Sequence, residues 1–204
     1  MSHACPFCQP GVTSQVLWEN EFYRIIPDKY PRCIGHLLVI SKPHQHNHMS
    51  IPIERLPVFE IAQYQASRFL LDIFGKASFL ENGGAHQEVS HAHLHCVPFT
   101  ASIPKTWVER DILHPIKNWK DVWFECKKIE DYCYAETATG RFILSRDTEY
   151  AALIHEMQTQ ITQQTNAKIN PRTGNLQRGG PAMVTETVRL WMEWSKKTSL
   201  RIGE

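Results

Sequence analysis

Hydrophobic residues in the first part of the chain follow two spacings, one typical of strands and one typical of a helix. Residues 14–41 hold two stretches rich in β-branched and aromatic residues, QVLWEN and EFYRIIPD, and then the apolar run HLLVIS. From Ile53 to about Lys76, apolar residues recur at helical spacing: Leu56, Phe59, Ala62, Ala66, Phe69, Leu70 and Ile73. The pattern predicts strands with an amphipathic helix lying across them.

Two more strands are predicted after this helix. SFLENGGAHQ has the pattern of a short strand followed by a Gly-Gly loop, and VSHAHLHCVPF has that of a strand ended by Pro98. Several strands flanking one helix favour an antiparallel sheet with packed helices, the α+β class.

The second half also has the pattern of a folded segment. EDYCYAETATGRFIL predicts a hairpin with Gly140 at its turn, and residues 147 to about 165 place apolar side chains on one helical face. The stretch NPRTGNLQRGGP is expected to be an irregular loop, and a last helix is expected from about Thr185 to Lys197. We therefore expect an α/β extension over residues 101–204.

Composition narrows the class of partner. Among 204 residues, 22 are lysine or arginine and 21 are acidic, so no net charge marks a general nucleic-acid or membrane-surface binder. No apolar run approaches the ~20 residues of a membrane span, and we expect a cytoplasmic protein. A chain of this kind needs no disulfide framework, and of its six cysteines only Cys5 and Cys8 have a telling spacing.

Three histidines stand at every second position in SHAHLHCVPF. On a strand, His91, His93 and His95 would project from one face, ~6.6–6.8 Å apart, while the residues between them point into the core. Such a surface can offer hydrogen-bond donors to an anion and a neutral imidazole nitrogen as a nucleophile, and phosphate is the natural match. A metal site or an exposed polar strand face are the alternatives.

The order of three motifs settles which family the chain is similar to. CPFC, GHLLVISKPH and ENGGAHQEVSHAHLHCVP follow one another, and with them the chain resembles the histidine triad (HIT) family of nucleotide hydrolases and transferases over roughly residues 3–99. The resemblance implies an antiparallel sheet with helices, usually a homodimer, that binds a nucleoside phosphate beside the triad strand. Residues 1–100 would form this nucleotide-binding domain, and residues 101–204 an extension packed on it, of unassigned function.

The resemblance also implies roles for the histidines. His93 would attack the α-phosphorus of a nucleotide and form a covalent nucleotidyl-imidazole, later broken by water. His95 and His36 would hydrogen-bond the phosphoryl oxygens as charge builds on them. Asp28 would accept hydrogen bonds from ribose hydroxyls, although it also suits a turn residue in IPDKYP.

Polar residues before the triad complete the implied substrate site. Asn82 and Gln87 match positions that contact phosphate or order the loop. Where well-known hydrolases of the family have serine or threonine after this glutamine, the chain has Glu88. A carboxylate there would repel a phosphate leaving group unless it is protonated or turned away, so the leaving group is an amine or a less anionic species, or Ser90 or His86 takes over.

A structural zinc ion is the second implied feature. Cys5 and Cys8 form a thiolate pair, and tetrahedral zinc needs two more ligands. Zinc-binding members of the family take them from the positions of His44 and His91, which would fasten the N-terminus to the sheet and orient the strand that carries His93. The alternative is a pair of free thiols. The other histidines of PHQHNHMS are rival ligands, but we interpret them as exposed loop residues: His46 and His48.

The sequence thus predicts a nucleotide hydrolase that cleaves a dinucleoside polyphosphate or a nucleoside phosphoramidate at the α-phosphate. A nucleotidyltransferase or diadenosine tetraphosphate phosphorylase is the first alternative; the uridylyl-transferring branch is disfavoured because it has glutamine at the position of His95. A non-catalytic, zinc-stapled nucleotide-binding protein is the second. Arg172 and Arg178 in the late loop either reach a polyphosphate or, as the pattern favours, lie in solvent.

Overall fold

The computed structural model describes residues 5–9, 15–84, 87–109, 113–128, 132–144, 147–171 and 176–202. Within them, eight strands form one antiparallel sheet in the order β1-β2-β3-β5-β4-β7-β8-β6. The strands are β1 (Trp18–Glu19), β2 (Tyr23–Pro27), β3 (Leu37–Ser41), β4 (Ser78–Gly83), β5 (His93–Val97), β6 (Leu113–Ile116), β7 (Tyr132–Thr137) and β8 (Gly140–Leu144).

Three of the five helices in the described residues lie where the sequence predicted them, with different ends, whereas the two short helices that follow residue 100 were not predicted. The five helices are α1 (Leu56–Phe74), α2 (Lys105–Glu109), α3 (Trp119–Cys126), α4 (Asp147–Gln164) and α5 (Pro181–Ile202), with 3₁₀ turns at Pro6–Cys8, His48–Ser50 and Ile53–Arg55. The first predicted helix starts three residues later than expected, because a 3₁₀ turn precedes it. It ends at Gly75, whose left-handed conformation at φ 69° lets its N–H bond to the carbonyl of Leu71.

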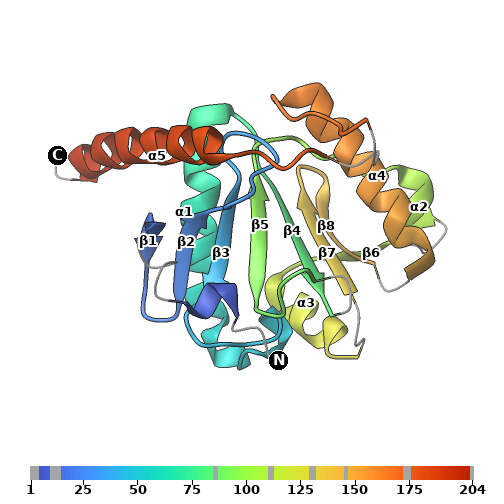
Figure 1. Ribbon diagram of the computed structural model, residues 1–204. Helices are drawn as coiled ribbons and strands as arrows, with labels where there is room; N and C mark the ends of the chain where they lie inside the picture. Colours follow the sequence, from blue (N-terminus) through green and yellow to red (C-terminus); the bar gives the residue numbers. More distant parts are fainter. Residues whose placement is uncertain are drawn as a thin grey trace.

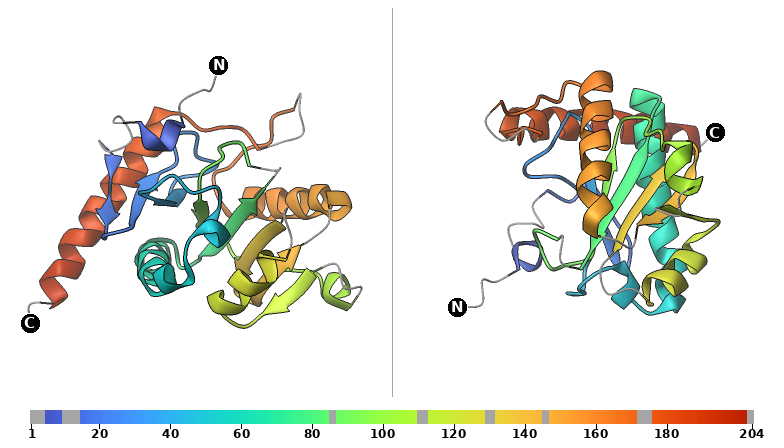
Figure 2. Two further views of the ribbon diagram at one scale, coloured as in Figure 1. Left: turned by 90° about the horizontal axis from the view of Figure 1, so that it is seen from below. Right: turned by 90° about the vertical axis from the view of Figure 1, so that its right-hand side faces the viewer.

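Helices cover both faces of the sheet, which confirms the α+β class. On one face, α1 and α3 bury side chains such as Phe59 and Trp119 against strand residues including Leu94. On the other face, α4 buries Leu153 and Met157 against the sheet. The right-hand view of Figure 2 shows α1 and α4 on opposite sides of the strands. Within the described residues, no helix is both long and apolar enough to cross a bilayer.

The triad strand is shorter than the sequence predicted. β5 begins at His93, so His91 lies in the bend that precedes the strand. The residues between the histidines do point into the core, as expected: Ala92, Leu94 and Cys96 are all fully buried. The ring of His91 contacts Cys5 and Cys8 through Nδ1 and Ser41 through Nε2.

The second half of the chain continues the sheet of the first half. β4 pairs with β5 on one side and with β7 on the other, in the register Leu80 to Ala135 and Asn82 to Cys133. The residues just before α5 lie beside the loop that precedes β3 (Figure 1), where Gly179 N–H donates to the carbonyl of Pro31 at 2.7 Å. Residues far apart in sequence therefore surround one region of the sheet.

Candidate functional site

A cleft of about 1390 Å³ lies on the face of the sheet that carries α4. The first half contributes predicted site residues to its lining: Asp28, His36, Asn82, His93 and His95. The second half contributes α4 and the segment after it, through Ile154, Met157, Gln158, Ile161, Leu176 and Arg178. The two halves of the chain thus share one cleft.

The bonding of His93 defines which of its nitrogens is free for chemistry. Its Nδ1 lies 2.6 Å from the carbonyl oxygen of His91, and a carbonyl can only accept, so Nδ1 carries the hydrogen. Burial lowers the pKa of His93, which keeps the ring neutral at pH 7. The free lone pair of His93 is therefore on Nε2, and His93 lines the cleft.

His36 and His95 form a hydrogen-bonded pair near His93. His36 Nδ1 accepts a hydrogen bond from the backbone N–H of Arg32 at 3.1 Å, so the hydrogen of the neutral ring is on Nε2. That Nε2 lies 3.0 Å from His95 Nδ1, which must accept, leaving the hydrogen of His95 on its own Nε2. Burial lowers the pKa of both rings, that of His95 well below its usual range. Each imidazole is a neutral donor.

Asp28 lies against this pair and also closes a turn. Its Oδ1 accepts from the backbone N–H of Tyr30 at 2.8 Å, and its Oδ2 lies 3.5 Å from His36 Nε2 and 4.0 Å from His95 Nδ1. Asp28 is therefore both a turn residue and a neighbour of the two histidines. One carboxylate oxygen shapes the loop and the other faces the histidines.

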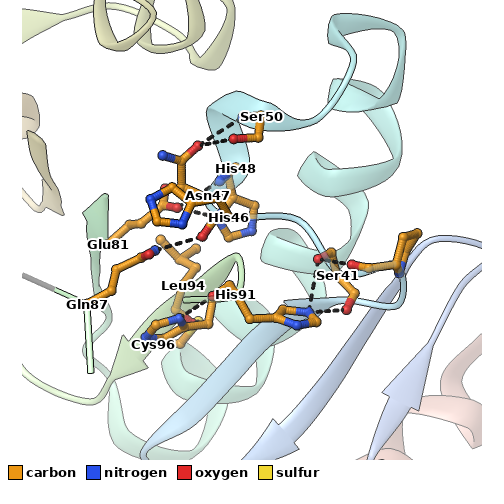
Figure 3. A network of polar contacts seen from close by, with 12 residues as sticks. Ser41, His46, Asn47, His48, Ser50, Glu81, Gln87, His91, Leu94 and Cys96 are labelled. Atoms are coloured by element: carbon orange, nitrogen blue, oxygen red, sulfur yellow. Dashed lines mark hydrogen bonds and ion pairs between the residues drawn. The ribbon is translucent and has the colours of Figure 1, made fainter. Parts of the chain in front are cut away.

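The two polar residues before the triad lie in different places. Asn82 lines the cleft from β4, and its Oδ1 accepts from the thiol of Cys133 at 3.6 Å. The Gln87 side chain instead donates to the carbonyl of His46 at 3.0 Å, as Figure 3 shows. Of the two roles expected for Gln87, this contact supports ordering of the loop.

The four predicted metal ligands lie together in space, next to the N-terminal 3₁₀ turn Pro6–Cys8. One ligand atom each from Cys5, Cys8, His44 and His91 lies within 4.8 Å of all the others. Cys5 Sγ is 3.4 Å and Cys8 Sγ 3.5 Å from His91 Nδ1, and Cys8 Sγ is 3.4 Å from His44 Nδ1. Tetrahedral zinc with ordinary bond lengths separates its nitrogen and sulfur ligands by about 3.6 Å.

His91 is prepared for a metal by its second nitrogen. Its Nε2 lies 2.8 Å from the carbonyl oxygen of Ser41 (Figure 3), so the hydrogen is on Nε2. Nδ1 is therefore left without a hydrogen, toward the thiols of Cys5 and Cys8. A carbonyl partner of this kind is the usual companion of a metal-bound histidine. The donor set and its protonation fit a zinc ion.

The rival ligands have other partners, and one of them corrects the sequence interpretation. His46 is exposed, as predicted, and bonds to Ser90 Oγ at 2.7 Å. His48 is not an exposed loop residue: it is 3% exposed, and its Nδ1 lies 2.8 Å from Glu81 Oε1 (Figure 3). The alternating polar pattern of PHQHNHMS hid the short helical turn that directs His48 inward.

Sequence reasoning missed two residues that build the site. Phe7 packs its ring against His91 and His93, with centroids 5.6 and 5.4 Å away. Thr187 of α5 accepts a hydrogen bond at 2.9 Å from the N–H of Gly35, the residue before His36. No sequence signal links Thr187 to a loop 152 residues earlier, whereas Phe7 stands inside the CPFC motif.

Glu88, the departure from the family pattern, is paired in the structure. Both of its carboxylate oxygens lie 2.7 Å from Arg178 Nη2. Arg178 therefore does not simply lie in solvent, as the sequence pattern favoured. Two other residues named from the sequence, His86 and Arg172, lie outside the described residues.

Comparisons with known proteins agree with this arrangement. The HIT domain model matches residues 9–101. The chain is 36% identical over 101 residues to adenosine 5'-monophosphoramidase of Saccharomyces cerevisiae, an alignment covering 47% of this chain and 62% of the yeast protein. It is 30% identical over 100 residues to an uncharacterized HIT-like protein of Methanocaldococcus jannaschii, covering 46% of this chain and 78% of that protein.

Among solved structures, a Zn-bound histidine triad family protein from Mycobacterium smegmatis is 28% identical, covers 47% of this chain and 74% of its own, and has a TM-score of 0.39. A histidine triad nucleotide-binding protein from Sulfolobus tokodaii is 28% identical, covers 49% and 78%, and has a TM-score of 0.42. The matched residues 9–101 contain the triad together with His36 and His44. The chain belongs to the HIT family.

Proposed function

We propose that the protein is a nucleotide hydrolase that cleaves a dinucleoside polyphosphate or a nucleoside phosphoramidate at the α-phosphate and releases a nucleoside monophosphate. One observation carries the proposal: His93 lines the cleft, and its Nδ1–H is held by the His91 carbonyl, so that Nε2 is the unprotonated nitrogen. A related monophosphoramidase sequence supports the same reaction class.

The first step forms one bond and breaks another. The lone pair of His93 Nε2 attacks the α-phosphorus, a phosphorus–nitrogen bond forms, and the leaving group departs with the electrons of its P–O or P–N bond. An amine leaving group takes a proton from solvent, and a polyphosphate needs none. His95 Nε2–H would donate to a phosphoryl oxygen as its charge builds, since His36 holds the ring in that tautomer.

The second step restores the enzyme. A water oxygen attacks the phosphorus, the bond to Nε2 breaks with its electrons returning to the imidazole, and the water releases a proton to solvent. The covalent intermediate divides one difficult displacement into two. Asp28 would accept hydrogen bonds from the ribose hydroxyls, and Asn82 would contact the phosphate from β4.

A zinc ion held by Cys5, Cys8, His44 and His91 would have a structural role in this scheme. When bound, it supplies a rigid cross-link between the N-terminus and the sheet. The same cross-link would fix the backbone of His91, whose carbonyl holds His93 Nδ1–H. The four ligands would thus support the nucleophile indirectly, through the backbone of His91.

The test is mass spectrometry of products formed in heavy-oxygen water from diadenosine polyphosphates and adenosine 5'-phosphoramidate. We expect one heavy oxygen in the released AMP with wild-type protein, and a loss of about a thousandfold or more in rate with His93→Ala, as for loss of a covalent nucleophile. His46→Ala, an exposed histidine outside the cleft lining, serves as the control for a lost imidazole.

Other outcomes are informative. Release of AMP that persists in His93→Ala would refute the covalent mechanism. Binding of these nucleotides without any product would favour a nucleotide-binding protein. Product formed only when phosphate is added would favour the phosphorylase, in which phosphate instead of water accepts the nucleotidyl group.

A further inference from the structure

Residues 176–178, which precede α5, form a wall of the cleft. Gln177 N–H donates to the carbonyl of Lys168, and Gly179 N–H donates to the carbonyl of Pro31, both at 2.7 Å. Arg32 Nη1 donates to the carbonyl of Leu176 at 3.0 Å. The backbone of Arg178 is therefore held by the hydrogen bonds of its two neighbours in the chain, Gln177 and Gly179.

Arg178 and Glu88 both line the cleft and contact each other. Its Nη2 contacts both oxygens of Glu88 at 2.7 Å, and its guanidinium carbon lies 5.5 Å from the ring centroid of Tyr30. The Arg178 side chain is 50% exposed and that of Glu88 68%. An ion pair this exposed contributes little to stability, so a better anion can displace the carboxylate.

The charge near this wall suits a polyanion. Lys29, Arg32 and Arg178 line the cleft together with two carboxylates, Asp28 and Glu88. The contact with Arg178 neutralises Glu88, the carboxylate that would otherwise repel a phosphate leaving group. A phosphate chain that takes over the guanidinium would leave Glu88 free to turn into solvent.

The cleft also has room for more than a nucleoside monophosphate. Its volume of about 1390 Å³ exceeds the roughly 300–1000 Å³ of ordinary small-molecule sites. On the side of α4, Ile154, Met157 and Ile161 add apolar lining. A flat aromatic base can bury its faces against such side chains.

We infer that the second half of the chain supplies a leaving-group subsite, in which Arg178 exchanges Glu88 for the phosphates of a dinucleoside polyphosphate and α4 contacts its second nucleoside. The inference rests on the proposed hydrolase function and deepens it, because it selects the polyphosphate over the phosphoramidate as the preferred substrate class. Arg178 is here a specificity-determining residue.

The test compares two substrates that share the adenylyl group and differ in what leaves. Diadenosine tetraphosphate releases an anionic nucleotide, whereas adenosine 5'-phosphoramidate releases ammonia. For Arg178→Gln, we expect the ratio of kcat/KM for tetraphosphate to that for phosphoramidate to fall about tenfold or more, as for loss of a charge-assisted hydrogen bond. Glu88→Gln should raise the same ratio, because it frees the guanidinium.

Arg189→Gln is the matched control. Arg189 is also 50% exposed and pairs with Glu186, but it lies on α5 and is absent from the cleft lining. Its substitution should leave the ratio unchanged. A ratio for Arg178→Gln equal to that of this control would overturn the subsite.

A binding measurement separates failure of the subsite from failure of the proposed reaction. If wild-type protein hydrolyses neither substrate, titration calorimetry can still compare its affinity for AMP with its affinity for diadenosine tetraphosphate. The subsite requires tighter binding of the tetraphosphate than of AMP, and a loss of about tenfold of that preference in Arg178→Gln. Equal preference in both proteins would refute it.

Discussion

The Nδ1 atom of His93 lies 2.6 Å from the carbonyl oxygen of His91, so the backbone of a candidate metal ligand holds the candidate nucleophile. The same His91 uses its ring Nε2 on Ser41 and directs Nδ1 to the thiols of Cys5 and Cys8. Metal binding and the orientation of His93 are thereby connected through one residue.

We predict about one zinc per chain in protein purified without added metal. The Cys5→Ser, Cys8→Ser double variant should lose it and should also lose activity, because His91 is then no longer clamped. Metal analysis by mass spectrometry measures the zinc, and His46→Ala, whose ring bonds to Ser90 instead, should retain it. Full zinc content in the double variant would remove the proposed site.

Thr187→Val should weaken the site from a distance. The substitution keeps the side-chain volume and removes the acceptor for the buried N–H of Gly35, next to His36. An unpaired buried donor costs about 1–3 kcal/mol of unfolding free energy. Urea unfolding measures this loss, and kcat should fall with it.

The control for this variant lies on the same helix. In Thr198→Val, the lost hydroxyl bonds only to the carbonyl of Trp194 one turn earlier, among the described contacts. This change should alter neither stability nor kcat appreciably. Equal effects in the two variants would show that Thr187 acts only through the helix itself.

Gly179→Ala should disturb the wall that carries Arg178, whereas Gly180→Ala should not. A Cβ at residue 179 would lie 2.7 Å from the carbonyl oxygen of Pro31 and 2.5 Å from the sulfur of Met183, while one at residue 180 meets nothing within 4 Å. The backbone contact cannot yield as a side chain can. Calorimetric affinity for diadenosine tetraphosphate should fall in the first variant alone.

Glu81→Gln should destabilise the protein at pH 7. Glu81 and His48 are a buried pair in contact at 2.8 Å, and weakening one partner of such a pair costs about 3 kcal/mol. Burial opposes the charge of Glu81, but His48 outweighs it, so the pKa of the carboxyl is lowered. A control variant, Glu125→Gln, changes an exposed pair with Lys128 and should have little effect.

The pH dependence of this effect follows from the sign of the shift. A carboxyl whose pKa is lower in the folded state stabilises the protein above its unfolded pKa of about 4.3 and loses that contribution as pH falls through the folded pKa. The stability difference between wild type and Glu81→Gln should therefore shrink on acidification below about pH 4. A constant difference across this range would contradict an ionised Glu81.

Local patterns in the sequence predicted most of the elements, although not α2, α3 or β6, and the resemblance to the HIT family implied the cluster of ligands. Apolar spacing located α1 and the hairpin at Gly140, and the motifs brought together Cys5, Cys8, His44 and His91. The inward turn of His48 was missed, because its partner Glu81 is 33 residues away and alternation alone cannot reveal a buried ion pair.

Contacts between the two halves of the chain could not be predicted either, because their partners are also far apart in sequence. Arg178 meets Glu88 across 90 positions, and Thr187 meets Gly35 across 152. Neither contact has a periodic signal or a motif. Both depend on how the chain returns across the sheet after α4.

The pairing of β4 with β7 has a consequence for any shortened form of the protein. In a chain ended near residue 100, the five residues of β4 that pair with β7, Phe79–Gly83, would form an open sheet edge, a rim of unpaired amide and carbonyl groups. Such a rim recruits strands from neighbouring molecules and promotes aggregation. The second half therefore protects the first from self-association at this rim, and the predicted homodimer would have to form through other surfaces of the folded chain.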